Sequence, residues 1–423
     1  MKILLWHGYL LAGTGSNVYT RSLARAWSQL GHDVTVLCQD PHPDRYDLGG
    51  ARVVRPPIGP VLPVYVIDGY EDLEARRIQD LDRETLARVV ERNAAELREH
   101  LPADLVLTNH LLLGGPVGAA AGVPYVVKAH GSELEFTMRG NEGLCAWARE
   151  TLGSADAILA GTEHVRRVIE EVLGAGPWLE AVHTVPPGVD VDEFRPQPRD
   201  EALAGLLAEA RLDPPNPPRA HNHRLPDEGN AQRLATFLAG DEPTVVFVGR
   251  ISREKGAHVL VEALEQAGLR CVMVGWGDIR DELEARVDAR RVLFTGPLEH
   301  RHLAHLFALA DVAVTPSTFP EAFGMVAAEA AACGAPPLVA RHSGLAEIAE
   351  GLEAEYPAPL RGLASFENGN VDELAAKLRA ICDLPHPDHS ALRVAARRAA
   401  VTRWSWEGIA TLILSRGWGT SSA

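Results

Sequence analysis

Residues 312–329 read VAVTPSTFPEAFGMVAAE and are the most informative part of the chain. The apolar run from Val312 to Thr315 predicts a buried strand, and the loop after it contains two prolines. The segment that ends at Glu329 then predicts the opening of a helix. A strand, a loop and a helix in direct succession form the repeating unit of an α/β sheet.

Two glutamates frame the start of this helix. Glu321 lies in the loop, and Glu329 follows eight positions later, a little over two helical turns at ~3.6 residues per turn. The first amides of a helix bind anions readily, so we expect a nucleotide diphosphate on the backbone of Phe323, Gly324, Met325 and Val326. One carboxylate would then face a sugar and the other a ribose. The alternative is a helix cap and a surface charge, although Glu329 lies among alanines and should need a partner.

A similar unit lies upstream, where Thr244–Val248 predicts a buried strand and a helix is expected from His258 to Ala267. Arg250 and Lys255 leave the carboxyl end of that strand, the place where doubly wound sheets bind ligands. Their positive charges suit phosphate oxygens. Only four of the 41 basic residues are lysines, which argues against Lys255 as surface filler.

Strand-like runs alternate with helical patterns through both halves of the chain. The expected strands cover residues 3–6, 33–38, 104–108, 125–129, 157–160, 245–248, 271–274, 292–295, 312–315 and 337–340. This alternation predicts an α/β fold of two Rossmann-like, doubly wound domains. Proline and glycine near residues 185–188 place the boundary there, giving domains 1–187 and 188–403. Residues 213–241 are interpreted as an insertion or mobile loop.

Composition excludes several classes of protein. The formal charge of −16 argues against nucleic acid as a partner and weakly against anionic membranes. No apolar run reaches 18 residues, so we expect no transmembrane helix. The five cysteines are odd in number and widely spaced, which indicates core thiols in a reduced cytoplasm and neither a disulfide framework nor a zinc site. The oligomeric state cannot be read from the sequence.

Several residues of the first half are candidates for a site. Gly13 and Gly15 lie between the first strand and a helix near residues 18–30, although an incomplete glycine pattern is often a plain turn. His130 ends the strand at residues 125–129, where a satisfied structural histidine is the common alternative. The polar stretch with Glu133, Arg139 and Asn141 is either a solvated loop or a surface that recognises an acceptor.

Two features of the second half point in different directions. Gly275 lies at a strand end, where it could form a tight turn or line a nucleotide cleft. The histidines His300, His302 and His305 suggest a metal cluster, but no cysteine or carboxylate completes a tetrahedral set. We therefore expect no metal site.

Five segments together resemble the family-four glycosyltransferases, retaining enzymes of the GT-B fold that depend on nucleotide sugars. They are Gly13-Thr14-Gly15-Ser16, Ala129-His130-Gly131-Ser132, Pro187-Gly188-Val189-Asp190, Gly249-Arg250 with Lys255-Gly256, and Glu321 through Glu329. The segments span almost the whole chain in the order of the family. Their combination is specific, whereas each one alone is weak.

The resemblance implies a nucleotide-diphosphate sugar as donor in a cleft between the domains, and a small-molecule, lipid-linked or glycan acceptor. It implies that His130 contacts the transferred sugar, that the Gly13–Gly15 loop holds the diphosphate or the acceptor, and that Leu298 lies at the nucleotide base. Glu321 and His130 are then the expected catalytic residues, acting without a cofactor. The resemblance also implies front-face attack with retention, and a last helix at residues 404–418 that crosses back onto the first domain.

Other functions stay open at this point. An oxidoreductase would need a full glycine fingerprint with a following acidic residue, which neither half has. A glycosidase would need two carboxylates at the sugar bond. A sugar-nucleotide epimerase of the same fold and a non-catalytic nucleotide-sugar binder remain as alternatives, and the base, the sugar and the acceptor cannot be read from the sequence.

Overall fold

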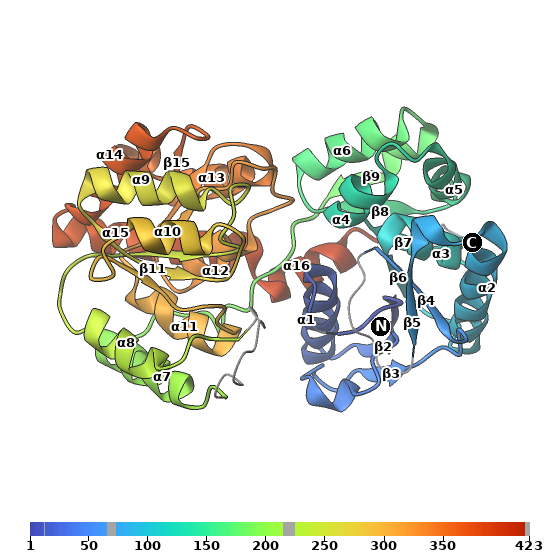
Figure 1. Cartoon of the computed structure of the whole chain (residues 1–423). Coiled ribbons are helices and arrows are strands. Elements are labelled where there is room, and N and C mark those ends of the chain that lie inside the picture. Colours follow the sequence, from blue (N-terminus) through green and yellow to red (C-terminus); the bar gives the residue numbers. More distant parts are fainter. Residues whose placement is uncertain (12, 66–72, 215–224, 419–423) are drawn as a thin grey trace. The chain divides into compact units, whose positions relative to one another are not determined.

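The computed structural model describes residues 1–11, 13–65, 73–214 and 225–418 (Figure 1). The chain divides into two compact units, which are described separately. Unit 1 comprises residues 1–188 and the segment from residue 406 onward, and unit 2 comprises residues 189–405. The sequence placed the first boundary one residue earlier, after Pro187.

A parallel sheet forms the centre of unit 1, in the order β3-β2-β1-β6-β7-β8-β9. The strands are β1 (Lys2–Trp6), β2 (Asp33–Leu37), β3 (Arg52–Val54), β6 (Leu105–Asn109), β7 (Val126–Lys128), β8 (Ala157–Ala160) and β9 (Val182–Thr184), and β4 (Val61–Val64) pairs with β5 (Glu74–Arg77) separately. Ile3 pairs with Val34 on one side and with Leu105 on the other. The strand order reverses at β1, and such a switch point is where α/β sheets leave a crevice for ligands.

Helices cover both faces of this sheet, which explains its continuous apolar strands. They are α1 (Gly15–Gln29), α2 (Arg83–Glu99), α3 (Gly115–Ala121), α4 (Gly131–Glu133), α5 (Glu142–Leu152), α6 (Glu163–Leu173) and α16 (Trp406–Ser415), with short 3₁₀ or π helices η1 (Pro43–Arg45), η2 (Ile78–Asp80), η3 (His110–Gly114), η4 (Leu134–Met138) and η5 (Pro177–Ala181). Side chains of β1 alternate between two cores: Leu4 and Trp6 join one, and Ile3 and Leu5 join the other.

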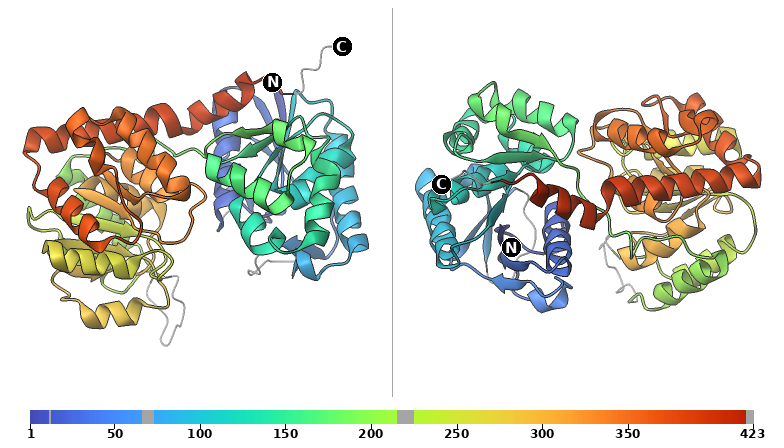
Figure 2. Two further views of the ribbon diagram at one scale, coloured as in Figure 1. Left: turned by 90° about the horizontal axis from the view of Figure 1, so that it is seen from above. Right: turned by 180° about the vertical axis from the view of Figure 1, so that it is seen from behind.

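The last helix, α16, follows all of unit 2 in the sequence yet belongs to unit 1. It packs beside α1 (Figure 2). Trp27 Nε1 of α1 donates a hydrogen bond of 3.1 Å to the Ala410 carbonyl. The ring of Trp406 lies 5.3 Å from that of Tyr19. The sequence placed a crossing helix at residues 404–418. In the structure α15 ends at Trp404, and α16 begins at Trp406.

Unit 2 repeats the architecture, with a parallel sheet in the order β12-β11-β10-β13-β14-β15. The strands are β10 (Thr244–Val248), β11 (Arg270–Val274), β12 (Val292–Phe294), β13 (Val312–Thr315), β14 (Pro337–Ala340) and β15 (Ser365–Phe366). The central strand β10 pairs with β11 and β13, and Phe247 lies beside Met273 and Val314. The switch point therefore falls at the carboxyl ends of β10 and β13.

The helices of unit 2 enclose its sheet. They are α7 (Arg199–Arg211), α8 (Asn230–Phe237), α9 (Ala257–Ala267), α10 (Arg280–Arg286), α11 (His300–Leu309), α12 (Met325–Ala332), α13 (Ser343–Glu355), α14 (Val371–Cys382) and α15 (His386–Trp404), with the short turn η6 (Ala358–Leu363). The long helix α15 packs against α12 and α13 and runs along the outside of the unit (Figure 2).

One expectation about the fold was wrong. Residues 213–241 were interpreted as a loop, but α8 lies within them and buries Leu234 against the core of unit 2, as does Leu238 just after the helix. The prolines and asparagines of this region obscured a short amphipathic pattern. Residues 215–224 of the same region lie outside the described part of the chain.

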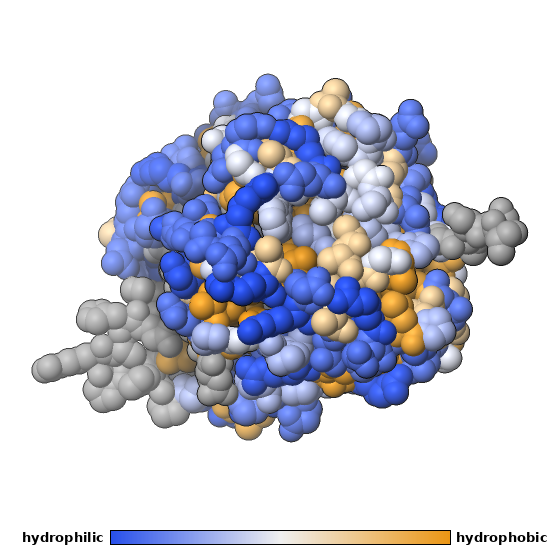
Figure 3. All heavy atoms as spheres, turned by 90° about the vertical axis from the view of Figure 1, so that its right-hand side faces the viewer, coloured by the Kyte–Doolittle hydropathy of each residue, from blue (hydrophilic) through white to orange (hydrophobic). Residues whose placement is uncertain are grey.

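The surface mixes hydrophilic and hydrophobic residues, and Figure 3 shows apolar areas scattered among polar ones on one face. Such a mixture is normal for a folded protein. Within the described residues, no helix is long and apolar enough to cross a membrane.

Candidate functional site

The loops that follow β10, β11 and β12 are joined by backbone hydrogen bonds at the carboxyl edge of the unit 2 sheet. Gly249 N donates to Val274 O at 3.0 Å, and Gly275 N donates to Gly296 O at 2.9 Å. Gly275 has a φ of +138°, and a Cβ atom there would lie 1.9 Å from the carbonyl oxygen of Gly249. Only glycine permits this close approach, so Gly275 shapes this edge whether or not a ligand is bound.

Arg250 and Lys255 leave this edge in different environments. Arg250 is exposed, with its guanidinium carbon 5.2 Å from the centre of the Trp276 ring. Lys255 forms an ion pair with Glu321 and is half-buried. Helix α9 follows, and its N-cap Gly256 has a φ of +68°. The structure therefore brings Lys255 to the loop after β13, as adjacent parallel strands allow.

Glu321 is held from three sides. Its carboxylate accepts hydrogen bonds from Lys255 Nζ and from Ser317 Oγ. Its backbone N–H donates to Ser343 Oγ at 2.9 Å, and its carbonyl accepts from Gly344 N at 2.9 Å. The position of this carboxylate is thus set by the loops that follow β10, β13 and β14.

His342 supports the same arrangement. Its Nε2 lies 2.6 Å from the Ser317 carbonyl oxygen, which can only accept, so Nε2 carries the proton. Its Nδ1 then accepts from Ser343 Oγ at 3.0 Å. Ser343 has a φ of +48°, an uncommon conformation for a residue with a side chain. The loop after β14, which carries His342 and Ser343, therefore also fixes Ser317 and Glu321 in the loop after β13.

Helix α12 begins where the sequence placed it. Its N-cap Gly324 has a φ of +116°, and its first intrahelical bond runs from Ala327 N to Gly324 O at 3.0 Å. The amides of Met325 and Val326 precede that bond, as the first amides of any helix do. Phe323 is buried, with its ring 6.1 Å from that of Trp404.

Glu329 lies on α12 and is 6% exposed. Burial, with a smaller contribution from the Glu193 carboxylate, raises the pKa of Glu329 to about 8. Of the residues that the structure describes, only His300 lies within ion-pair distance, with its Nε2 at 3.8 Å from Oε1. The carboxyl group is therefore protonated near neutral pH in the absence of a ligand.

In unit 1, the glycine loop leads from β1 into α1. Gly13 has a φ of +96°, and α1 begins at Gly15 with Thr14 as its N-cap. A Cβ atom added at either glycine would meet no other atom of the described chain within 4 Å. Neither glycine is therefore required by close packing, although Gly13 is favoured by its backbone conformation.

His130 follows β7 and is held by Asn109 at the end of β6. The Asn109 amide nitrogen donates to the Trp6 carbonyl at 3.3 Å, so the other amide atom, Oδ1, faces His130 Nε2 at 2.8 Å. Nε2 therefore carries the proton of the neutral ring. Burial, the charge of Lys128 and then that of His7 hold the pKa of His130 well below its usual value.

A group of aromatic and ionisable side chains surrounds His130. The ring of His110 lies 4.6 Å from that of His130, and the ring of Tyr65 lies 4.7 Å from that of His110. His110 has a φ of +73°. Lys128 is buried, which lowers its pKa to about 7, and donates to the Val185 carbonyl at 3.2 Å.

The three acceptor-side candidates have roles within the fold. Glu133 is fully buried, and its carboxylate accepts from the backbone N–H of His130, Leu111 and Leu112 at 3.0–3.2 Å. The solvated-loop interpretation was therefore wrong for Glu133, because buried backbone amides need this acceptor. Burial raises the pKa of Glu133 to about 7, against the opposing effect of these hydrogen bonds.

Arg139 and Asn141 are also engaged by neighbouring residues. Arg139 is exposed and pairs with Glu135 at 2.7 Å and with Glu171 at 3.4 Å. Asn141 is the N-cap of α5 and accepts from Leu144 N at 3.2 Å. A contact of either residue with an acceptor stays a prediction.

The histidines of α11 point to separate partners. His302 Nε2 lies 3.1 Å from Asp213 Oδ1, and His305 Nδ1 lies 2.8 Å from Gln197 Oε1. Within the described part of the chain, no group of three or more His, Cys, Asp and Glu residues is arranged to hold a metal ion. Leu298, at the loop before α11, packs partly against the core of unit 2.

The sequence interpretation missed several residues around these two centres. They are Ser317, His342 and Ser343 at Glu321, and Tyr65, Asn109, His110 and Lys128 near His130. The signal that could have found most of them is polar residues at or directly after the end of a strand, as in Asn109-His110 at the end of β6 and Arg341-His342-Ser343 after β14.

In comparison with known proteins, each of the two units matches a glycosyltransferase family. The family described as Glycosyltransferase Family 4 matches residues 13–193, and that described as Glycosyl transferases group 1 matches residues 230–399. The chain is 29% identical over 400 residues to D-inositol 3-phosphate glycosyltransferase of Xylanimonas cellulosilytica, covering 86% of this chain and 87% of that protein. It is 29% identical over 423 residues to D-inositol 3-phosphate glycosyltransferase 1 of Catenulispora acidiphila, covering 92% and 88%.

Solved structures share the fold. Sucrose-phosphate synthase from Thermosynechococcus elongatus aligns with a TM-score of 0.61 at 22% identity and 100% coverage of both chains. HepE of Anabaena, solved in complex with UDP and glucose, aligns with a TM-score of 0.65 at 18% identity and 98% coverage of both chains.

Proposed function

The chain belongs to glycosyltransferase family 4 and has the GT-B fold, and from this premise we propose how it transfers a sugar from a nucleotide-diphosphate donor to an acceptor. The observation that supports the proposal is the edge of unit 2 at β10 and β13. Lys255, Glu321 and the amides at the start of α12 are held there by the loops of adjacent strands. Positive charge beside a positioned carboxylate suits a donor that carries both a diphosphate and a sugar.

Lys255 and Glu321 exchange partners when the donor binds. Without a ligand, each neutralises the other. On binding, Lys255 turns to a phosphate oxygen together with Arg250 and the amides of Phe323, Gly324, Met325 and Val326. Glu321 is then free to accept a hydrogen bond from a sugar hydroxyl. The ammonium group stabilises the charge that builds on the leaving diphosphate, so the reaction proceeds without a divalent ion.

The remaining donor contacts follow the ends of neighbouring strands. Glu329 holds the ribose hydroxyls, and the Gly275 and Leu298 loops contact the nucleoside. Unit 1 contributes His130, which binds a hydroxyl of the transferred sugar, and the backbone of Gly13 and Gly15, which completes the donor site. This assignment is supported by the neutral ring of His130, which carries its proton on Nε2, and by the open space next to both glycines.

The reaction retains the anomeric configuration through front-face attack, without a protein nucleophile. The support is the environment of Glu321, whose carboxylate accepts a hydrogen bond from Ser317 Oγ and, once Lys255 has turned to the phosphate, a second one from a sugar hydroxyl. A carboxylate held in this way is a hydrogen-bond acceptor and a weak nucleophile. The acceptor hydroxyl then attacks from the side on which the diphosphate departs.

The acceptor is a small hydroxylated molecule, a glycan or a lipid-linked sugar. Relatives named for D-inositol 3-phosphate make a phosphorylated cyclitol the first acceptor to test. The five cysteines are free thiols, which is consistent with a reducing compartment such as the cytoplasm.

The experiment is a product assay with UDP-, ADP- and GDP-sugars, run with and without acceptor. A transferase forms a glycoside only when acceptor is present, and the coupling constant of its anomeric proton reports retention or inversion. Conversion of the donor sugar without acceptor would indicate the epimerase. Binding of the donor with no turnover on any acceptor would indicate the non-catalytic binder.

A further inference from the structure

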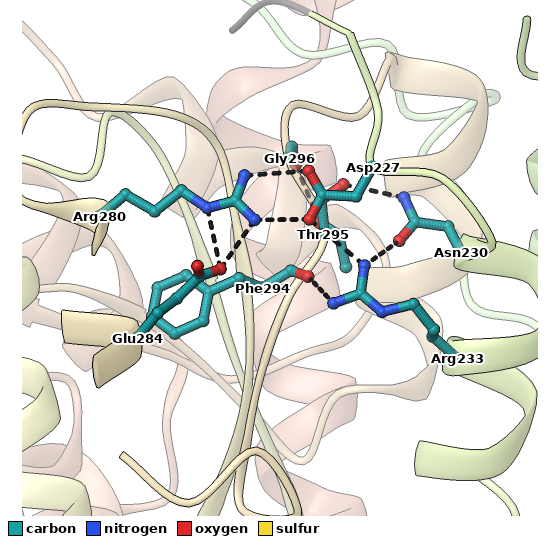
Figure 4. Close-up of polar contacts among 8 residues, drawn as sticks. All are labelled: Asp227, Asn230, Arg233, Arg280, Glu284, Phe294, Thr295 and Gly296. Carbon is teal, nitrogen blue, oxygen red and sulfur yellow. Dashed lines mark hydrogen bonds and ion pairs between the residues drawn. The ribbon is translucent and has the colours of Figure 1, made fainter. Parts of the chain in front are cut away.

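A polar network centred on Asp227 lies at the end of β12 in unit 2 (Figure 4). The Asp227 carboxylate accepts from both terminal nitrogens of Arg280, at 3.0 and 2.5 Å. It also accepts from Arg233 Nη1 at 3.3 Å. A second carboxylate, Glu284, pairs with Arg280 at 2.8 Å, so two acids balance two guanidinium groups.

The same segment is fastened to the backbone that leaves β12. Asp227 N and Asn230 Nδ2 both donate to the Thr295 carbonyl at 2.8 Å, and Arg233 Nη2 donates to the Phe294 carbonyl at 2.7 Å. The guanidinium of Arg280 lies over the ring of Phe294, 5.8 Å from its centre. Thr295 is fully buried. The chain around Asp227 therefore lies directly on the end of β12.

Gly296 makes this contact close. It has a φ of +68°, and a Cβ atom there would lie 2.8 Å from Asp227 Oδ1 and 2.9 Å from the Leu225 carbonyl oxygen. Its own carbonyl accepts from Gly275 N at 2.9 Å. Arg280 opens α10, directly after the 275–278 loop. Asp227 is thus linked to the loops that carry Gly275 and Leu298.

This pair differs from an ordinary surface ion pair. The side chains of Arg280 and Asp227 are 20% and 23% exposed, and their contact is bidentate. Exposed pairs contribute little because solvent screens them, whereas a planar fork between two partly buried groups fixes a geometry. By contrast, the Arg290–Asp288 pair of the same unit has exposures of 90% and 45%.

We propose that Asp227 is a positioning residue for donor binding, which fixes the Gly275 loop and the Gly296–Leu298 loop through Arg280 and Arg233. It would set the affinity for the nucleoside part of the donor and the discrimination between bases. This inference rests on the proposed function, in which those two loops contact the nucleoside. Asp227 itself touches no reacting atom, so its loss should affect binding more than the chemical step.

The test is calorimetric titration of UDP, ADP and GDP into the full-length wild type, Asp227→Asn and Asp288→Asn. Asp227→Asn keeps the size of the side chain and removes its charge, and Asp288→Asn is the same change at an exposed pair. We expect Asp227→Asn to bind the preferred nucleotide about tenfold more weakly, the lower end of the loss when supporting contacts are removed. The differences among its affinities for UDP, ADP and GDP should also become smaller. Asp288→Asn should bind all three nucleotides with wild-type affinity.

Kinetics supply a second readout. With the active donor, Asp227→Asn should raise KM while kcat at saturating donor stays near the wild-type value. If Asp227→Asn does not fold, as judged by circular dichroism, Arg233→Gln removes only the outer part of the network and should shift affinity and selectivity in the same direction.

The outcomes separate this inference from the function on which it rests. A wild type that binds none of the three nucleotides would overturn both. A wild type that binds selectively, with a folded Asp227→Asn or Arg233→Gln of identical affinity and selectivity, would overturn the positioning role alone. A fall in kcat with unchanged KM would also overturn it.

Discussion

Replacing Glu329 by glutamine should change how the stability of unit 2 depends on pH. Burial raises the pKa of Glu329 from 4.5 to about 8. Between these values the folded state holds a proton that the unfolded state has lost, so the free energy of unfolding falls by about 1.4 kcal/mol for each unit of rising pH. The stabilising effect of the protonated carboxyl is complete below the unfolded pKa and is lost as the pH approaches the folded one.

Thermal unfolding can measure this difference in the free energy of unfolding between the wild type and Glu329→Gln. From pH 5 to pH 7 the free energy of unfolding of the wild type should fall by about 2–3 kcal/mol relative to that of Glu329→Gln, because the amide cannot ionise. For a domain of this size each kcal/mol corresponds to about 2–4 °C. The difference in Tm between variant and wild type should therefore grow by about 4–12 °C over that range.

The assay is differential scanning calorimetry of both proteins across this pH range, without nucleotide. Glu265→Gln on α9 is the matched control, because its carboxylate is 46% exposed and pairs with Arg286. Its Tm should run parallel to that of the wild type. Parallel curves for Glu329→Gln as well would refute the reasoning, since the carboxyl would then be ionised in the folded protein at little cost.

Three further predictions follow from the same unit. Glu321→Ala should lower turnover by about 10²–10³-fold, the scale for one positioned polar group, and near-normal turnover with every active donor would favour a helix-cap role. Arg250→Ala and Lys255→Ala should each weaken binding of a nucleoside diphosphate in calorimetric titration while circular dichroism stays unchanged. Wild-type affinity in both variants would exclude a role of these two side chains in binding the diphosphate. Activity should survive EDTA, so complete loss that magnesium or manganese restores would contradict metal independence.

Much of the fold could be predicted because its signals are local. The apolar runs at residues 157–160, 312–315 and 337–340 coincide with β8, β13 and β14, since strands buried on both faces need unbroken apolar sequence. Short or polar strands such as β5, which reads Glu-Ala-Arg-Arg, carry no such signal. Helix α8 was missed for a related reason, because its few buried leucines lie among residues typical of loops.

The site could be predicted only in part. The sequence could place Glu321, Lys255 and the start of α12 at one edge of a sheet because they lie next to strand ends in the sequence. The pairing of Lys255 with Glu321 joins residues 66 positions apart, and the role of Glu133 depends on amides of a different loop. Such contacts follow from the strand order, which a single sequence does not display. The contacts of Asp227 are of the same kind.

The return of α16 to unit 1 has a consequence for biosynthesis. The hydrogen bond of Trp27 cannot form until Ala410, which lies 383 residues further along the chain, has been synthesised. At about 5–20 residues per second, a ribosome needs about 20–80 s to supply it. During that interval the face of α1 that α16 covers is open to other apolar surfaces. Unit 2 is continuous in sequence and can close earlier, so the domain whose synthesis starts first is the one completed last.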